Sequence, residues 1–408
     1  MKKIPASSAV SSVKSNSQGS EPKAGSTRRR RAKNCVATSF NGTPLKSPPL
    51  AARPRQDPDR RIIGLDLGDK SMCFRVVDGE GRVLEEGAST TSSTEIAVFA
   101  KRHPGAEVLM EAGGNSPWVQ REFCKQGLKA VVTKADILCG RRRRKNDPTD
   151  AAELAELMRM NSNRIVEVEH KPEDVAVDFV LLKARDTLVK SRTAAINFVR
   201  GELKTFGVRI QPMDADCFGR RAAPHVPAEL RRALKPMIDE IVGLTARIKS
   251  YEKNIKKAVA TTYPQAKRFV DEVYGVSDVV ALAFVLTIFN PERFRRARDV
   301  GPYLGLEPKE RSSGTIKPQL GVSKAGNPFM RKLLVQSAHF LLGGFAVNEE
   351  RSGDLREWGM SLKRRGGKAA KKRAAVAVAR KLAVAMLASW KSETPWDPRY
   401  ASKRKKTA

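Results

Sequence analysis

The chain is poor in the side chains that build disulfide frameworks and thiolate metal sites. Its 408 residues include four histidines and five cysteines. The cysteines are far apart, odd in number and without a Cys-x-x-Cys pair: Cys35, Cys73, Cys124, Cys139 and Cys217. This pattern excludes a disulfide framework and a Cys-x-x-Cys zinc site, and it suits a reducing cytoplasm.

Long apolar runs and acidic residues are scarce as well. No stretch approaches the ~20 apolar residues that span a bilayer, and no apolar segment follows Lys2 and Lys3. We therefore expect neither a membrane span nor a secretory signal. The 44 acidic residues are outnumbered by 77 lysines and arginines, which gives a formal net charge of +33. Such an excess indicates a polyanionic partner, with nucleic acid as the first candidate and an anionic membrane surface as the second.

Composition and periodicity divide the chain into five expected regions. Residues 1–58 are rich in Ser, Pro, Gly and basic residues without an apolar period, which predicts a disordered basic tail. We expect an α/β domain over residues 59–165, a helical linker over 166–262, a helical domain over 263–392 and a second basic tail over 393–408.

The α/β region shows the pattern of a mixed sheet. Apolar strands are expected at 62–66, 72–77, 83–87, 106–111 and 130–132, with helices near 93–102 and 116–126. The first three strands are joined by short turns, and the later ones alternate with helices. This order predicts an RNase H-like fold, in which acids from the first strand, the fourth strand and a later helix meet.

Four acids fall at those places. Asp66 lies near the end of the first strand, Glu111 ends the fourth, and Asp147 and Asp150 open a helix three residues apart, on one face. A bound cation makes such buried carboxylates tolerable, and oxygen donors without His or Cys select Mg²⁺ or Mn²⁺ over Zn²⁺. Three of these acids also have a plainer interpretation: Asp147 as a helix cap, Asp66 before Gly68 as part of a nucleotide-binding turn, and Glu111 as a surface acid.

Two groups of cations are candidates for phosphate contacts. The first is an uninterrupted run directly before the aspartate pair, formed by Arg141, Arg142, Arg143, Arg144 and Lys145. A solvated surface run is the common explanation for such a cluster, but its position beside the acids favours a phosphate contact. The second lies in and after the polar loop 307–324 and is expected to clamp a scissile phosphate: Arg311, Lys317, Lys324 and Arg331.

The second half of the chain is expected to be helical. Long helices over 177–206 and 228–261 flank a Gly- and Pro-rich break, and they form either an antiparallel hairpin or arms that pair with another subunit. Shorter helices are expected over 294–304 and 328–342. A further apolar helix starts near Ser277, and such a start can hold a phosphate on its free amides, although a plain core helix is the commoner explanation.

Taken together, the acids and three C-terminal stretches resemble the DEDD transposases of insertion sequences, relatives of the Piv-type DNA invertases. The stretches are residues 303–308, residues 312–314 and residues 323–331. The resemblance implies a RuvC-like N-terminal domain, a coiled-coil-like linker and a mostly α C-terminal domain with a nucleophilic serine. Ser313 matches that serine best, and Ser312 and Ser323 are the alternatives.

The resemblance also implies partners and a reaction. Members of the family act as oligomers, here a dimer or tetramer, and use an RNA encoded by the element to bring donor and target DNA together. We therefore expect Ser313 to attack a DNA phosphate beside a Mg²⁺ site, in a bacterial cytoplasm at the nucleoid. Two alternatives stay open: an RNase H-like nuclease that uses water as nucleophile, and a non-enzymatic nucleic-acid-binding protein.

Overall fold

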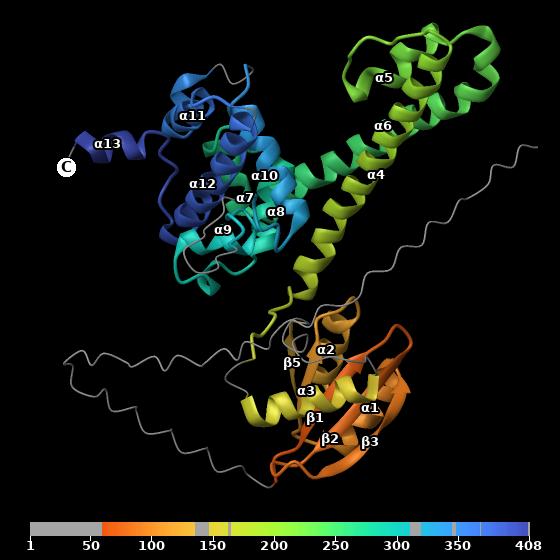
Figure 1. The fold of residues 1–408 in the computed structure, drawn as a ribbon, viewed down its shortest axis with the longest axis vertical. Helices are drawn as coiled ribbons and strands as arrows, with labels where there is room; N and C mark the ends of the chain where they lie inside the picture. Colours follow the sequence, from red (N-terminus) through yellow and green to blue (C-terminus); the bar gives the residue numbers. More distant parts are fainter. Residues whose placement is uncertain are drawn as a thin grey trace, which may run out of the picture. The chain divides into compact units, whose positions relative to one another are not determined.

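The structure is a computed structural model, drawn in Figure 1. It describes residues 59–134, 147–161, 165–310, 320–344, 348–367 and 369–406. Several predictions concern residues outside these ranges: the tail 1–58, the basic run 141–145, Arg311, Ser312, Ser313 and Lys317.

A mixed five-stranded sheet forms the first part, as the sequence predicts. Its strands are β1 (Ile62–Leu67), β2 (Ser71–Val77), β3 (Val83–Thr90), β4 (Glu107–Glu111) and β5 (Lys129–Thr133). The strand order is β3-β2-β1-β4-β5, with β1, β2 and β3 antiparallel and β1, β4 and β5 parallel. The apolar β1 lies in the centre, and the polar β3 lies at an exposed edge.

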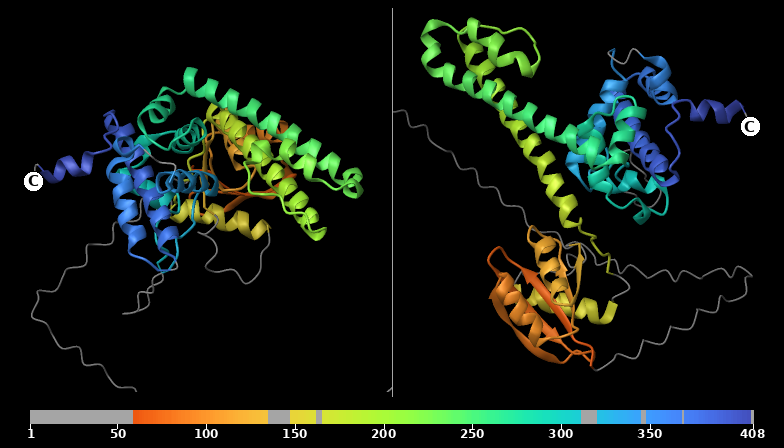
Figure 2. Two further views of the ribbon diagram at one scale, coloured as in Figure 1. Left: turned by 90° about the horizontal axis from the view of Figure 1, so that it is seen from above. Right: turned by 180° about the vertical axis from the view of Figure 1, so that it is seen from behind.

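Helices cover both faces of this sheet (Figures 1 and 2). One core joins Ile63 and Leu65 to Phe99 of α1 (Ser93–Arg102) and Phe123 of α2 (Ser116–Lys125). The other core joins the alternate strand residues, including Ile62 and Leu109, to Leu154 and Met158 of α3 (Asp147–Asn161). Successive side chains of a strand point to opposite faces, so α1 and α2 lie on one side and α3 on the other.

Two long helices pair with each other within the chain. They are α4 (Glu173–Thr205) and α6 (Ala228–Thr261), joined through α5 (Ala215–Ala222). Arg185 Nε lies 3.2 Å from Glu252 Oε1, and Arg192 Nη1 lies 3.2 Å from Thr245 Oγ1, which fixes an antiparallel register. The structure therefore has the helical hairpin, one of the two arrangements that the sequence left open (Figure 2).

Most of the remaining helices contribute to one large core that contains the apolar helix α8. The remaining helices are α7 (Pro264–Glu272), α8 (Asp278–Ile288), α9 (Val300–Tyr303), α10 (Pro328–Leu341), α11 (Glu349–Arg364), α12 (Ala370–Ser392) and α13 (Tyr400–Lys406). Residues 280–288 of α8 are all buried, because that helix is apolar on every side. In the described part of the chain, no helix is both long and apolar enough to cross a bilayer.

One expected helix is wrong. Residues 294–304 do not form a single amphipathic helix but two short helical pieces, the 3₁₀ turn Ala297–Asp299 and α9. The Asp299 carboxylate accepts a hydrogen bond from the Arg296 amide at 3.0 Å, which caps a new turn that starts at Arg296, and Phe294 has an extended backbone. The periodicity of the apolar side chains survives these breaks, which explains the incorrect prediction.

Candidate active site

Asp66 and Glu111 lie at the carboxyl ends of neighbouring parallel strands. In the register of β1 and β4, Leu65 is opposite Met110, and the two acids are the next residue of each strand. Both side chains are partly buried. Carboxyl ends of parallel strands share one edge of a sheet, so the two acids are brought to the same place.

The two acids also share a face of the sheet. Asp66 follows Gly64 by two residues, and Glu111 follows Leu109 by two, and both of these earlier positions face α3. Because strand side chains alternate, Asp66 and Glu111 point to the α3 side as well. Helix α3 packs directly on β1: a Cβ placed on Gly64 would lie 2.0 Å from the carbonyl oxygen of Ala151.

Helix α3 runs antiparallel to β1 and so places its acidic start beside those strand ends. Ala151 lies over Gly64, whereas Arg159 near the other end of α3 donates to the Gly79 carbonyl at 3.5 Å. Gly79 follows the end of β2, which pairs with the beginning of β1. The first turn of α3, with Asp147 exposed and Asp150 3% exposed, therefore lies toward the end of β1 that carries Asp66.

The thiol of Cys73 gives an electrostatic link between the helix and the strand. Cys73 is opposite Asp66 on β2. Burial raises the pKa of the Cys73 thiol, and the negative charges of Asp147 and Asp66 raise it further. Both carboxylates therefore lie close enough to one side chain to influence its ionisation.

The type of donor found near this edge suits a hard divalent cation. All four are carboxylates, and oxygen donors are what Mg²⁺ and Mn²⁺ prefer. In the described ranges, no three His, Cys, Asp or Glu side chains are gathered closely enough to hold a metal ion. The fold thus places Asp66 and Glu111 at one edge and directs the acidic start of α3 toward it, and in the described ranges their oxygens are not arranged around a single point.

A second candidate element is the base of the polar loop in the helical part. Gly305 and Gly326 have φ of +64° and +77°, a region that favours glycine. A Cβ on Gly305 would lie 2.0 Å from the Ala325 carbonyl oxygen, and one on Gly326 would lie 1.9 Å from that of Tyr303. Glycine at positions 305 and 326 therefore allows the backbone segments 303–305 and 325–326 to lie in direct contact.

Backbone hydrogen bonds continue this contact into the loop. The backbone amide of Lys309 donates to the Gly321 carbonyl, and the backbone amide of Ser323 donates to the Glu307 carbonyl, both at 2.8 Å. The segment 311–319, which contains Ser312 and Ser313, connects the two sides of this closed base.

Three predicted site residues lie within the described part of this loop region. Lys324 is exposed, as a phosphate contact requires. Arg331 donates from Nη1 to the carbonyls of Leu304 at 3.0 Å and Ala325 at 3.1 Å, so it holds the loop base together. Ser323 Oγ is buried and has no hydrogen-bond partner among the described residues, and an inaccessible oxygen is unsuited to nucleophilic attack.

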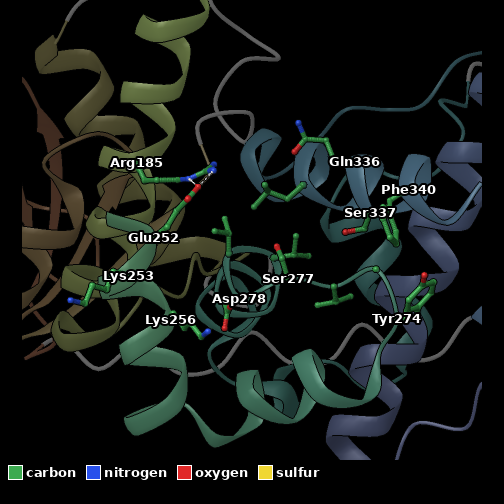
Figure 3. Close-up of a pocket in the computed structure, with 15 residues that line it drawn as sticks. Arg185, Glu252, Lys253, Lys256, Tyr274, Ser277, Asp278, Gln336, Ser337 and Phe340 are labelled. Carbon is green, nitrogen blue, oxygen red and sulfur yellow. Dashed lines mark hydrogen bonds and ion pairs between the residues drawn. The ribbon is translucent and has the colours of Figure 1, made fainter. Parts of the chain in front are cut away.

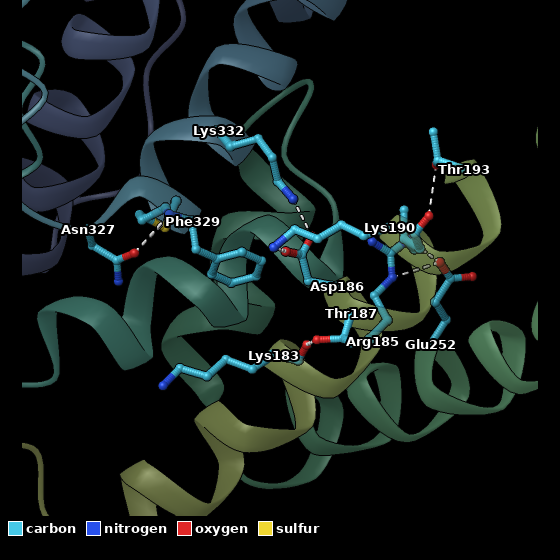
Figure 4. A network of polar contacts seen from close by, with 12 residues as sticks. Lys183, Arg185, Asp186, Thr187, Lys190, Thr193, Glu252, Asn327, Phe329 and Lys332 are labelled. Carbon is cyan, nitrogen blue, oxygen red and sulfur yellow. Dashed lines mark hydrogen bonds and ion pairs between the residues drawn. The ribbon is translucent and has the colours of Figure 1, made fainter. Parts of the chain in front are cut away.

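An ion network that the sequence analysis missed fixes α10 to α4 (Figure 4). The buried Asp186 accepts a hydrogen bond from Lys332 and lies 3.1 Å from Lys190 Nζ. Burial by itself would raise the pKa of Asp186, but the hydrogen bonds and charges of these lysines lower it below its usual value. A lone acid among Lys183, Arg185 and Lys190 was the available signal in the sequence.

Comparison with known proteins places these elements in a family. Residues 63–207 match the DEDD-type IS110 transposase model, described as "Transposase", and residues 267–343 match the "Transposase IS116/IS110/IS902 family" model. The first match covers the acids of the α/β part, and the second covers the loop base and α10. Together the two matches span more than half of the chain.

Similar proteins are described as transposases, and each aligns with this chain over most of its own length. The transposase for insertion sequence element IS1111A of Coxiella burnetii is 29% identical over 71% of this chain and 80% of its own. The transposase for insertion sequence element IS1328 of Yersinia enterocolitica is 26% identical over 74% and 89%. A probable family 20 transposase of Pseudomonas aeruginosa is 27% identical over 68% and 82%. The chain belongs to the DEDD transposases of insertion sequences, and its activity is that of a DNA transposase.

Proposed function

We propose that Asp66, Glu111, Asp147 and Asp150 form an RNase H-like (RuvC-like) active site that holds Mg²⁺ or Mn²⁺. One observation carries this proposal: Asp66 and Glu111 end neighbouring parallel strands on the face against which the acidic start of α3 packs. The sheet order β3-β2-β1-β4-β5 supports the RNase H-like assignment, since the first and fourth strands are adjacent in it.

The four carboxylates have distinct parts in this site. A divalent ion held there would stabilise the negative charge that develops on a reacting phosphate. Asp66 and Glu111 offer oxygens from strand ends in the sheet, which fixes their position. Asp147 and Asp150 come from a helix start, where the dipole favours the ionised form of a carboxylate.

We further propose that Ser313 is the nucleophile. Its hydroxyl would replace one DNA oxygen on the phosphorus and lose its proton, while the departing strand end leaves as a hydroxyl. Attack by another strand end on the serine-linked phosphate would then restore Ser313 and join donor to target. The closed loop base supports this assignment over Ser323, whose oxygen is buried.

The phosphate contacts and partners are proposals as well. Lys324 is exposed beside the loop base and is suited to a phosphate contact. The same role is proposed for Arg311, Lys317 and the run 141–145, and a partial one for Arg331. The net charge of +33 supports a polyanionic partner. We propose element DNA and an RNA encoded by the element as the partners, bound by a dimer or tetramer at the nucleoid.

The test is recombination of a plasmid that carries the coding region with its own flanking DNA. Asp66→Asn keeps the shape of the side chain and removes its charge, and it should abolish recombination while DNA binding persists. Asp69→Asn, an exposed acid three residues further on, is the matched control and should recombine normally. Full recombination by Asp66→Asn would refute the role of the acids.

A second measurement separates the serine reaction from hydrolysis. Denaturing the protein during the reaction should trap a covalent protein–DNA adduct, and Ser313→Ala should remove it. Cut DNA without an adduct would favour the nuclease that uses water.

A further inference from the structure

A cavity of about 770 Å³ lies in the helical part, and its lining contains none of the four acids and none of the described residues of the polar loop (Figure 3). It is lined by residues of α4, α6 and α10, by the turn that joins α7 to α8, and by the first turn of α8. Its volume is within the range of sites that hold a small organic group. None of the residues proposed above for metal binding or nucleophilic attack contributes to it.

The start of α8 presents free amides to this cavity. Ser277 is the N-cap residue, but its side chain makes no capping hydrogen bond. Within the described residues, no hydrogen bond is found for the amides of Asp278, Val279 and Val280. A helix start with free amides attracts anions, phosphate above all, through its amides and dipole. Gly275, with φ of +84°, forms the tight turn that leads into this start.

A buried hydroxyl points into the same space. Ser337 on α10 is 4% exposed, and its Oγ has no hydrogen-bond partner among the described residues. Figure 3 shows this oxygen directed toward the start of α8. A buried polar atom without a partner is costly, and a ligand oxygen in the cavity would satisfy it.

The charges around the cavity favour an anion. Lys253 and Lys256 are exposed on α6, and neither forms an ion pair within the described part of the chain. Arg185 is neutralised by its ion pair with Glu252. Asp278 in the first turn of α8 is the one acid in the lining whose charge no described cation pairs. The lining as a whole is therefore positive by one charge.

An aromatic pair borders the apolar side of the cavity. The rings of Tyr274 and Phe340 lie 5.6 Å apart at an interplanar angle of 60°. Phe340 is 40% exposed, so part of its ring is accessible to a ligand. An exposed aromatic face beside a phosphate site is how single-stranded nucleic acids are recognised, because every base can stack on it.

We propose that this cavity binds one unpaired nucleotide of a nucleic-acid strand. The phosphate would lie on the α8 amides and the Ser337 hydroxyl, Lys253 and Lys256 would neutralise the backbone on either side, and the base would stack against Phe340. The inference goes beyond the metal-dependent reaction and does not depend on it.

The test measures binding of fluorescent twelve-residue single strands by the full chain in EDTA, so that failure of the metal site cannot affect it. Lys253→Ala/Lys256→Ala should weaken binding about tenfold and lower the salt dependence of log K by about 1.4, as expected for two lost phosphate contacts. The control Lys249→Ala/Lys257→Ala removes the same charge from exposed positions of α6 outside the lining. Equal losses in both double variants would overturn the proposal.

Two further variants test the base and the anion separately. Phe340→Ala should weaken binding of a normal strand about fivefold or more, yet leave binding of an abasic strand unchanged. Asp278→Asn removes a negative charge beside the phosphate and should tighten binding, a gain that misfolding cannot produce. The proposal would also be overturned if either variant bound single strands with the wild-type affinity.

Strands of DNA and RNA with the same sequence distinguish the two sources of the nucleotide. A loss confined to DNA assigns the cavity to a donor or target strand, and one confined to RNA assigns it to the RNA partner. Equal losses, each beyond the control, would show recognition through phosphate and base alone.

Discussion

Replacing Gly64 with alanine is expected to damage stability and transposition together. The added Cβ would lie 2.0 Å from the Ala151 carbonyl oxygen and 2.4 Å from the Ala155 amide nitrogen. Both atoms belong to the backbone of α3, which therefore has to retreat by about 1.4 Å to reach ordinary contact distance. Overpacking of this kind costs about 1–3 kcal/mol of the free energy of unfolding.

The same displacement separates the acids of the helix from those of the strands. Asp147 and Asp150 move with α3, whereas Asp66 and Glu111 stay with the sheet. A misplacement of about 1 Å in an active site can lower the rate about 100-fold. Urea denaturation and plasmid recombination measure the two effects on one preparation.

The control for this variant is Gly113→Ala. Gly113 follows β4 close to Glu111, and a Cβ there would meet nothing within 4 Å. It should leave stability and recombination nearly unchanged. A Gly64→Ala protein that recombines at the wild-type rate and unfolds at the wild-type urea midpoint would refute the packing of α3 against β1.

Two further predictions concern the helical part. Burial and the charges of Arg293 and Lys183 lower the pKa of Lys171 to about 8, so between pH 8 and about 10.4 the unfolded chain binds this proton more tightly than the folded one. The free energy of unfolding of the wild type, relative to Lys171→Met, should therefore rise over that range, and chemical denaturation at both ends of it measures the change; a constant difference would contradict the prediction. Gly305→Ala combines a positive φ with a clash against the Ala325 backbone, so it should abolish recombination and cost about 1–3 kcal/mol or more, whereas Gly321→Ala, with open space around it, should do neither. Equal melting temperatures and equal recombination of these two variants would show that the loop base is not needed.

Elements with a strong local pattern were predictable from the sequence. The helices over 93–102 and 228–261 have the expected bounds. All five expected strands are present, and most of their ends lie within one residue of the predicted ones. In these segments, apolar periodicity, caps and breaking residues agree with each other. The positions of Asp66 and Glu111 on strands and of Asp147 and Asp150 on a helix start could be inferred in the same way.

Features that depend on contacts between distant segments could not be predicted. Nothing local in the sequence shows that Gly64 faces α3 or that Gly305 meets Gly326, because each glycine is permissive in many turns. The α4–α6 pairing depends on contacts such as the hydrogen bond from Arg192 to Thr245, and no heptad pattern in the sequence predicts these contacts. Apolar periodicity predicted a helix over 294–304 because it ignores the local hydrogen bond that caps a new turn at Arg296.

The central claim is that the four acids together hold a divalent cation. Anomalous diffraction from crystals grown with Mn²⁺ tests it most directly, because the ion itself is located. We expect a peak at about 2.0–2.3 Å from carboxylate oxygens of Asp66 and Glu111, with Asp147 or Asp150 completing the site. The absence of any Mn²⁺ peak at that edge of the sheet, with ions bound elsewhere, would contradict the account.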